Sequence, residues 1–288
     1  MALFSLLIAG SFSIGSRAAP FIESGALNSI RFFFAVLVMA GATLAVFPKE
    51  KRGLLMKPTA VWRFAILGAL MGFYFISMFI GLRVTDPVSL GAVFTLMPLM
   101  SAGFAFLFLR QSAKPVVLLG LLIAGVGAIW VIFRGDLDAL LRFDVSKGEV
   151  IYFSGCAAHA AYAPLVRKFN RGEPVTAFTL WTLIATWICI MIYGATEIGE
   201  TDWAALPSIV WITIAYLAVF TTAGTFFLLQ YATMRIPAAK AIAYGYLTPS
   251  YIILLEGLSG AGWVSPLVIT GALITVLGLV ILIRSSDV

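Results

Sequence analysis

Polar and aromatic side chains recur inside apolar segments of the chain, where they could bind a small molecule within a membrane. The segment AIAYGYLTPSYIILLEGL, residues 241–258, carries Tyr244, Thr248 and Tyr251 at spacings of four and three residues. Such spacings place side chains on one face of a helix. Because tyrosines that face lipid gather at the two membrane interfaces, this face predicts one wall of an interior cavity.

A second segment, GEVIYFSGCAAHAAYAPLVRK at residues 148–168, repeats the pattern. Tyr152, Cys156, His159 and Tyr162 follow one another along one helical face at spacings of four, three and three residues. A lone histidine within a span is more often a hydrogen-bonded core residue than a proton relay, and both interpretations of His159 stay open. Two segments that each carry polar and aromatic side chains along one helical face favour a shared cavity. His159 and Tyr162 are therefore assigned to its wall.

Other apolar segments supply the remaining candidates for the cavity wall, which carry phenol, hydroxyl or thioether groups. They are Tyr74, Ser77, Met78, Thr95, Thr221 and Thr225. Serine and threonine in helices often bond their own backbone, so each of them is weak support alone. Such a wall suits a neutral zwitterion with an apolar or aromatic side chain. It suits sugar phosphates poorly, because those require several buried lysines or arginines.

Two charged residues and two prolines complete the candidate machinery. A charge at the bilayer centre costs about 2.5–3.5 kcal/mol. Glu256 is therefore either a coupling carboxylate or a residue at the membrane rim. As a coupling carboxylate it would carry a proton or pair with a substrate ammonium. Lys240 either attracts a substrate carboxylate or extends its ammonium into the interface. Pro98 and Pro249 each remove a backbone hydrogen bond and kink a helix, and each kink is either a hinge or static.

The composition places these side chains in a membrane protein. Hydrophobic residues make up 61% of the chain and charged residues only 11%, whereas soluble domains have about 25% charged residues. One histidine and two cysteines exclude a dense metal or disulfide framework, and no cofactor is expected. The net charge of +6 comes from basic residues in short loops, which indicates membrane topology rather than nucleic-acid binding.

The fold class expected is an all-α polytopic membrane protein with ten transmembrane helices, since each crossing needs about 20 apolar residues. The first apolar run lacks a basic segment before it, which favours a span over a cleaved signal peptide. The expected spans are residues 2–18, 26–47, 61–83, 87–109, 115–134, 149–168, 175–195, 207–230, 238–259 and 266–284.

The basic residues predict the orientation of these spans. With a cytoplasmic N-terminus, thirteen lysines and arginines fall on the inner side and five on the outer side. Lys49, Lys51, Arg52 and Lys57 in the second loop contribute most to this excess. Because cytoplasmic loops are enriched in lysine and arginine, both termini are expected in the cytoplasm.

The chain resembles itself after a shift of 151 residues. Residues 115–136 and 266–287 are identical at eight of 22 aligned positions. Each copy holds five expected spans, an odd number, so the second copy must cross the membrane in the opposite direction. We therefore expect two inverted repeats, residues 1–136 and 149–288, joined by a periplasmic linker at 137–148. Inverted repeats are typical of secondary transporters, with the substrate site at the repeat interface.

Two pairs of glycines recur at matching positions in the last span of each copy. Gly120 and Gly127 lie seven residues apart, as do Gly271 and Gly278. This spacing corresponds to two turns of one helical face, and small residues let membrane helices approach closely. We expect these two spans to pack against each other.

The chain resembles the EamA-type branch of the drug/metabolite transporter superfamily over essentially its whole length. The resemblance lies in the ten spans in two halves, in ALNSIRFFFAVLV with Arg31, and in the glycine-spaced GLLIAGVG and GALITVLG. Within that branch it is most similar to the YddG-type exporters of aromatic and other neutral amino acids. The family usually ends each fourth span with a Gly-Glu pair, whereas this chain has Arg110 in the first copy and Glu256 ahead of its glycine in the second.

The resemblance implies a secondary transporter that exports amino acids and related small metabolites across the bacterial inner membrane by alternating access. A broad exporter of hydrophobic drugs or cations is the alternative, and Glu256 would then matter most. An intramembrane enzyme is more remote, because it needs a nucleophile, a base and an orienting group within reach. A small-molecule substrate and the lipid bilayer are the expected partners. A monomer is expected and oligomers stay open, as does the choice between proton coupling and facilitated diffusion.

Overall fold

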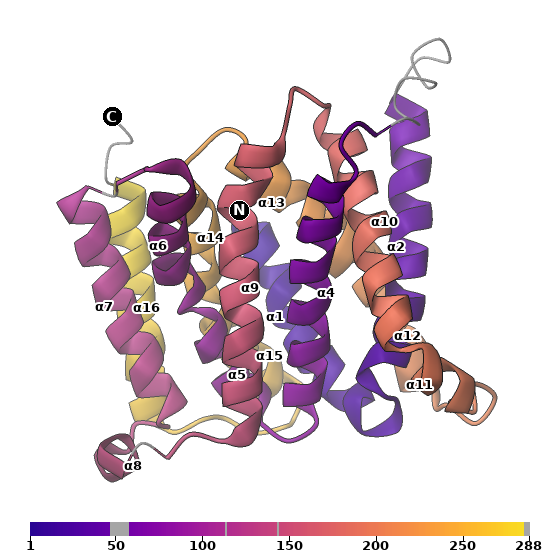
Figure 1. Ribbon diagram of the computed structural model, residues 1–288. Coiled ribbons are helices and arrows are strands. Elements are labelled where there is room, and N and C mark those ends of the chain that lie inside the picture. The colour runs from indigo at the N-terminus through magenta and orange to yellow at the C-terminus, as the bar shows by residue number, and fades with distance from the viewer. Residues whose placement is uncertain (47–57, 113, 143, 285–288) are drawn as a thin grey trace.

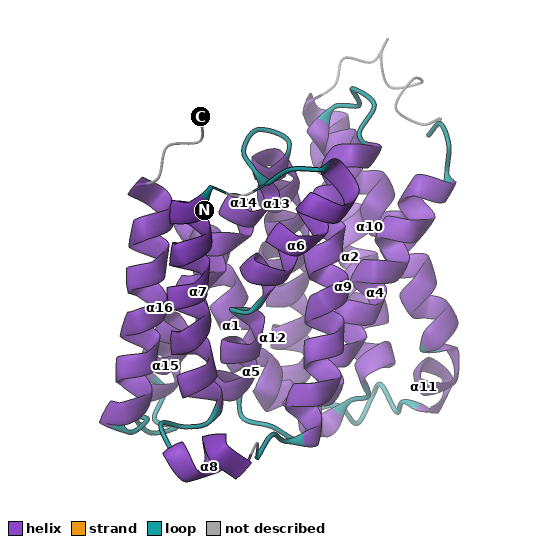
Figure 2. Cartoon of the chain, turned by 60° about the vertical axis from the view of Figure 1, so that its left-hand side comes forward, coloured by secondary structure: helices purple, strands orange, loops and turns teal. Residues whose placement is uncertain are grey.

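The computed structural model describes residues 1–46, 58–112, 114–142 and 144–284, and the regular elements within these ranges are all helices. Figures 1 and 2 show them as one bundle whose long helices run roughly side by side, with α8 and α11 at one end. The elements are α1 Ala2–Ala18, η1 Ala19–Phe21, α2 Ser24–Val46, α4 Trp62–Leu82, α5 Pro87–Phe94, α6 Met97–Leu109, α7 Pro115–Ile132, α8 Leu137–Arg142, α9 Lys147–Phe169, α10 Val175–Tyr193, α11 Ala195–Glu200, α12 Ser208–Tyr216, η3 Leu217–Gly224, α13 Thr225–Thr233, α14 Ala238–Ala243, η4 Tyr244–Leu247, α15 Thr248–Leu258 and α16 Pro266–Arg284.

Eight of the ten expected spans are helical segments long and apolar enough to cross a membrane. The other two are α9, which is rich in small and polar residues, and the segment 238–258, which is broken into short helices. The chain is thus an all-helical polytopic membrane protein, while the count of ten and the inverted relation stay predictions. The basic residues Lys49, Lys51, Arg52 and Lys57 lie outside the described residues.

Polar side chains define where two of the central helices begin. Asp86 Oδ1 accepts a hydrogen bond from the Ser89 backbone N–H at 2.9 Å at the start of α5. At the start of α9, Ser146 and Glu149 form a capping box, in which each side chain accepts from the backbone N–H of the other. These caps bind N–H groups that have no partner within the helix, and so fix the ends of α5 and α9.

The expected contact between the two glycine-spaced helices is confirmed. Helices α7 and α16 lie side by side in both views (Figures 1 and 2). A methyl group on Gly127 would lie 2.6 Å from the Gly271 carbonyl oxygen, and one on Gly278 would lie 2.6 Å from the Gly120 carbonyl oxygen. The backbones therefore touch, and only glycine fits at these positions.

The two expected proline kinks are instead helix breaks. Pro98 and Pro249 are the second residues of α6 and α15, where a missing N–H costs little because first-turn N–H groups have no intrahelical partner. The Gly245 carbonyl oxygen, four residues before Pro249, accepts a hydrogen bond from the Thr248 N–H at the end of the 3₁₀ turn η4. Each proline therefore begins a new helix rather than bending a continuous one.

A second irregularity divides the span 208–233. Between α12 and α13 the backbone adopts a π-helix, η3, over Leu217–Gly224. Such π-helical turns are rare and occur frequently at functional sites. The turn carries Thr221 and Thr222, both buried, toward the interior of the bundle.

An ion pair between a buried arginine and a partly exposed glutamate joins the start of α4 to the loop between α9 and α10. Arg63 Nη2 lies 2.6 Å from Glu173 Oε1, and the Arg63 side chain is 1% exposed. Arg63 also donates to the carbonyl oxygens of Thr59 and Phe169. The pair therefore links segments about 110 residues apart in the chain.

This ion pair should make stability depend on pH. Burial acts to raise the pKa of the Glu173 carboxyl, but hydrogen bonds from Arg63 and from the Arg171 backbone N–H outweigh it and hold the pKa below the ordinary 4.5. A carboxylate with a lowered folded-state pKa stabilises the fold above its unfolded-state pKa, and this stabilisation is lost as the pH falls through the folded-state pKa. Glu173→Gln should therefore lower the thermal unfolding midpoint at neutral pH, and its difference from the unmodified protein should shrink below pH 4.5. A difference that does not change with pH would contradict this reasoning.

Candidate functional site

A small cavity lies where α1, α2, α4, α9, η3 and α13 meet in the interior of the bundle. Its wall is largely aromatic, with Phe4, Tyr74, Phe75, Tyr162 and Phe226. The polar members of the wall are Ser11, Arg31, His159, Thr221 and Thr225. No carboxylate is among the lining residues, so Arg31 is the one charged group that faces this space.

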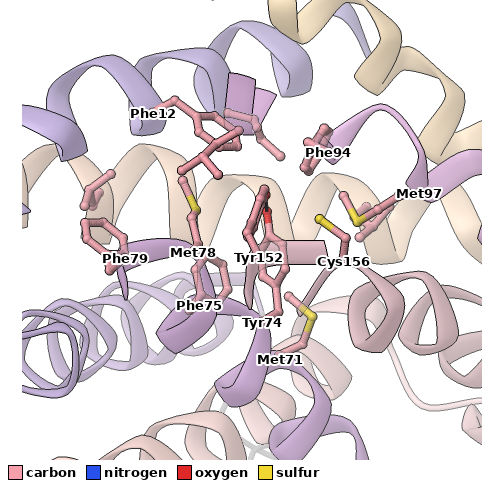
Figure 3. Close-up of a cluster of buried hydrophobic side chains, with 14 of the residues drawn as sticks. Phe12, Met71, Tyr74, Phe75, Met78, Phe79, Phe94, Met97, Tyr152 and Cys156 are labelled. Atoms are coloured by element: carbon pink, nitrogen blue, oxygen red, sulfur yellow. Dashed lines mark hydrogen bonds between the residues drawn. The ribbon is translucent and has the colours of Figure 1, made fainter. Parts of the chain in front are cut away.

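The cavity is nearly filled by its own side chains. It leaves about 20 Å³ for the centre of a water molecule, and a single water needs about 10–15 Å³ by this measure. Figure 3 shows the packing beside it, where Tyr74, Tyr152 and Cys156 lie close together among Met71, Phe75 and Met78. In this conformation the cavity is too small for an amino acid.

The structure brings five of the residues chosen from the sequence to this cavity. They are Tyr74, His159, Tyr162, Thr221 and Thr225. They come from α4, α9, η3 and α13, so the expectation of one shared space matches their placement. Their role in binding a substrate stays a prediction.

Three further candidates are buried but do not line the cavity. The Thr95 hydroxyl donates to the Ala92 carbonyl oxygen at 2.6 Å. Ser77 lies in the contact between α4 and α9, where its Cβ would be 2.8 Å from a methyl group on Gly155. Met78 belongs to the cluster in Figure 3. Ser77 and Met78 thus pack α4, which carries part of the wall, whereas Thr95 lies at the end of α5.

The tyrosine stripe of residues 241–258 does not reach the cavity. Tyr244 and Tyr251 are half-buried, and Thr248 is buried with no hydrogen-bond partner for its hydroxyl among the described residues. The 3₁₀ turn η4 has three residues per turn instead of 3.6, so its four residues shift the helical phase by about 80°. The three side chains therefore do not continue one α-helical face.

The proposed coupling residues also lie away from the cavity. Glu256 is half-buried in α15, and its Oε1 atom is buried with no hydrogen bond among the residues the structure describes. Lys240 is half-buried in α14. Neither lines the cavity in this conformation.

Arg31 is the most important site residue that was not assigned to the cavity from the sequence. It is fully buried in α2, and its Nε donates to Thr222 Oγ1 at 2.6 Å. Its Nη1 donates to Asn28 Oδ1 at 3.3 Å and its Nη2 to Thr221 Oγ1 at 3.4 Å. The guanidinium carbon also lies 4.3 Å from the centre of the Phe75 ring. The sequence feature that could have identified this residue is an arginine inside an apolar segment.

Gln230 is a second residue that sequence reasoning missed. Its Nε2 donates to the Tyr162 hydroxyl at 2.7 Å, and its Oε1 accepts from Thr179. Tyr74 and Tyr152 are similarly joined by a hydrogen bond of 2.9 Å between their hydroxyls. These bonds satisfy the buried tyrosines and hold the rings of Tyr74 and Tyr162 at the cavity wall.

Within the described residues, no group of three or more histidine, cysteine, aspartate or glutamate side chains is placed to hold a metal ion. Cys156 and Cys189 are both unpaired thiols in helices, where they pack as small hydrophobic residues.

A sequence model described as the EamA-like transporter family matches residues 1–133 and again residues 146–284. The cavity lies between these two regions, since α1, α2 and α4 belong to the first match and α9, η3 and α13 to the second. The family model thus covers all helices that line the cavity.

Two proteins of similar sequence agree with this match, and one solved structure shares the fold. The chain is 23% identical over 276 residues to the uncharacterized transporter YyaM of Bacillus subtilis (strain 168), covering 96% of this chain and 89% of that protein. It is 27% identical over 198 residues to the aromatic amino acid exporter YddG of Escherichia coli (strain K12), covering 64% of each. A solved crystal structure with 18% sequence identity is similar in fold, with a TM-score of 0.74 over 97% of this chain and 94% of that chain.

Proposed function

Because the chain belongs to the EamA-like transporter family, we propose that it exports aromatic and other neutral amino acids, and related small metabolites, across the bacterial inner membrane. The similarity to an aromatic amino acid exporter supports this substrate class. We propose that it acts as a monomer, with both termini in the cytoplasm and substrate leaving toward the periplasm.

The composition of the interior cavity is the observation that carries the proposal. Aromatic rings from α1, α4, α9 and α13 surround it, and its polar groups are hydroxyls, one imidazole and one guanidinium. Rings in offset or edge-on contact with an aromatic ligand contribute about 0.5–1.5 kcal/mol each beyond the buried area. Such a wall binds a phenyl, indole or phenol side chain better than a sugar or a phosphate.

Alternating access would open this cavity to one side of the membrane at a time. We propose that residues 1–136 and 149–288 are inverted repeats that rock against each other, with residues 137–148 as the periplasmic linker. The breaks before Pro98 and Pro249 and the π-helical turn η3 interrupt three of the long segments. These are the places where backbone angles can change without bending a complete helix.

The alternative, an exporter of hydrophobic drugs or cations, finds less support. The charged group at the cavity is the guanidinium of Arg31, which repels a cation. Glu256, the residue on which that alternative depends most, does not line the cavity.

Transport by the purified protein tests the proposal. Proteoliposomes loaded with labelled phenylalanine should release it faster than protein-free liposomes, and unlabelled tryptophan or tyrosine should compete. No release of any of these amino acids, together with transport of hydrophobic cations, would overturn the proposal.

A pair of neighbouring phenylalanines tests the cavity itself. Phe226 lines the cavity and stacks on Phe75 at a centroid distance of 6.0 Å, whereas Phe227 contacts Tyr231 instead. Phe226→Leu should raise the apparent KM for phenylalanine by about two- to tenfold, the value of one aromatic contact. The control Phe227→Leu should leave the KM unchanged. Equal effects of the two substitutions would show that the rings around this cavity do not contact the substrate.

A further inference from the structure

The guanidinium of Arg31 is buried deep in the membrane-spanning part of the protein. Arg31 is the eighth residue of α2, about 10 Å along the axis from the first residue of the helix, and is fully inaccessible to solvent. A guanidinium at such depth is costly unless an anion or a dense set of acceptors compensates for its lost hydration. The burial of Arg31 therefore requires a physical explanation, whereas a hydrated arginine in a loop does not.

The partners of Arg31 are neutral. Three of the five N–H donors of an arginine are used here, on the hydroxyls of Thr221 and Thr222 and the amide oxygen of Asn28. The ion pairs found within the described ranges join Arg63 to Glu173 and Arg83 to Glu23. The positive charge of Arg31 is thus held by weak acceptors and by the face of Phe75, and it lacks a resident counterion.

The charge of Arg31 lies at the wall of the cavity, where it would contact a bound ligand. Arg31 lines it together with Thr221 and His159. His159 is 3% exposed, and its Nδ1 atom makes no hydrogen bond to any described residue. Two polar groups thus remain incompletely satisfied at one space, one a guanidinium with two unused donors and the other an imidazole nitrogen. Together they indicate a missing polar ligand that is anionic on the Arg31 side.

We propose that Arg31 recognises the carboxylate of the transported molecule. In an open conformation the two unused N–H groups would form the parallel hydrogen bonds that guanidinium makes to a carboxylate. This inference rests on the proposed function and refines it, because it makes the carboxylate the required group. The lining residues include no carboxylate that could pair with an ammonium group, so amines and amides without a carboxylate should bind more weakly than the amino acid.

A series of related ligands tests this on the unmodified protein, without any substitution. In counterflow of labelled phenylalanine into proteoliposomes, 3-phenylpropionate should compete nearly as well as phenylalanine, since both carry a carboxylate. Phenylalaninamide and 2-phenylethylamine share the ring and the amino group but lack the carboxylate, and they should compete at least about tenfold less well. Equal competition by the amide and the amino acid would overturn the assignment.

Substitution of Arg31 separates a binding role from a structural one. Arg31→Gln should raise the KM for phenylalanine by about ten- to a hundredfold, and should abolish the preference for phenylalanine over its amide. Arg31→Lys keeps the charge and should restore part of that preference. Arg235→Gln, at an exposed position, controls for the general loss of an arginine. An Arg31→Gln protein that is folded and still prefers the carboxylate would refute the proposal.

The two proposals can fail separately. If phenylalanine is transported but the carboxylate gives no preference, export of amino acids stands and the role of Arg31 is wrong. If phenylalanine is not transported, export of amino acids is wrong, and thermal stabilisation of the purified protein then decides the role of Arg31. In that case stabilisation by 3-phenylpropionate but not by 2-phenylethylamine would support carboxylate recognition, and its absence would refute it.

Discussion

Replacing Gly127 by alanine is expected to lower the free energy of unfolding by about 1–3 kcal/mol. The added methyl group would lie 2.6 Å from the carbonyl oxygen of Gly271 and 2.8 Å from the backbone nitrogen of Thr275. Both contacts are with backbone of α16, which cannot move aside as a side chain can, so α7 and α16 must separate. Thermal unfolding in detergent, followed by fluorescence, measures the effect.

Gly125 provides the matched control two residues away on the same helix. A methyl group there would meet no atom within 4 Å. Gly125→Ala should therefore leave the unfolding midpoint unchanged or raise it slightly, because alanine favours helix more than glycine does. Equal losses in the two variants would mean that the glycine contact between α7 and α16 is not what stabilises this part of the fold.

Replacing Arg63 by alanine is expected to cost about 2–5 kcal/mol of stability. The substitution empties a buried site and removes hydrogen bonds to Glu173, Thr59 and Phe169. It would also release the start of α4 from the loop that joins α9 and α10. The measurement is again the unfolding midpoint, together with the yield of monodisperse protein.

The second ion pair of the described structure is the control for this prediction. Arg83 and Glu23 also form an ion pair, but their side chains are 35% and 50% exposed. An exposed pair typically contributes about 0–1 kcal/mol, so Arg83→Ala should change the unfolding midpoint little. A larger loss for Arg83→Ala than for Arg63→Ala would refute the argument from burial.

Local chemistry made several features of this protein predictable from the sequence. The glycine spacing in residues 115–136 and 266–287 predicts the α7–α16 contact, because a seven-residue spacing defines one helical face whatever lies opposite. The periodicity of α9 likewise brings His159 and Tyr162 to one side. Tyr74, Thr221 and Thr225 reached the same cavity, as polar residues in an apolar span tend to avoid lipid.

Features that depend on contacts between distant segments were not predictable in this way. The stripe of Tyr244, Thr248 and Tyr251 assumes a continuous α-helix, and the 3₁₀ turn η4 changes the phase within it. Arg31 is visible as one arginine in an apolar run. Whether it extends to the interface or stays buried depends on Thr221 and Thr222, about 190 residues later in the chain.

The sequence by itself determined that this is an all-helical membrane protein of two related halves, since apolar length and repeated spacing are properties of each segment alone. Only the tertiary structure decided which apolar faces turn inward. Because lipid tails are as apolar as leucine, hydropathy does not distinguish the lipid-facing from the core-facing side where no polar residue marks a face. The contacts that each helix face makes with the rest of the protein determine the closed aromatic cavity, the break at η4 and the burial of Arg31.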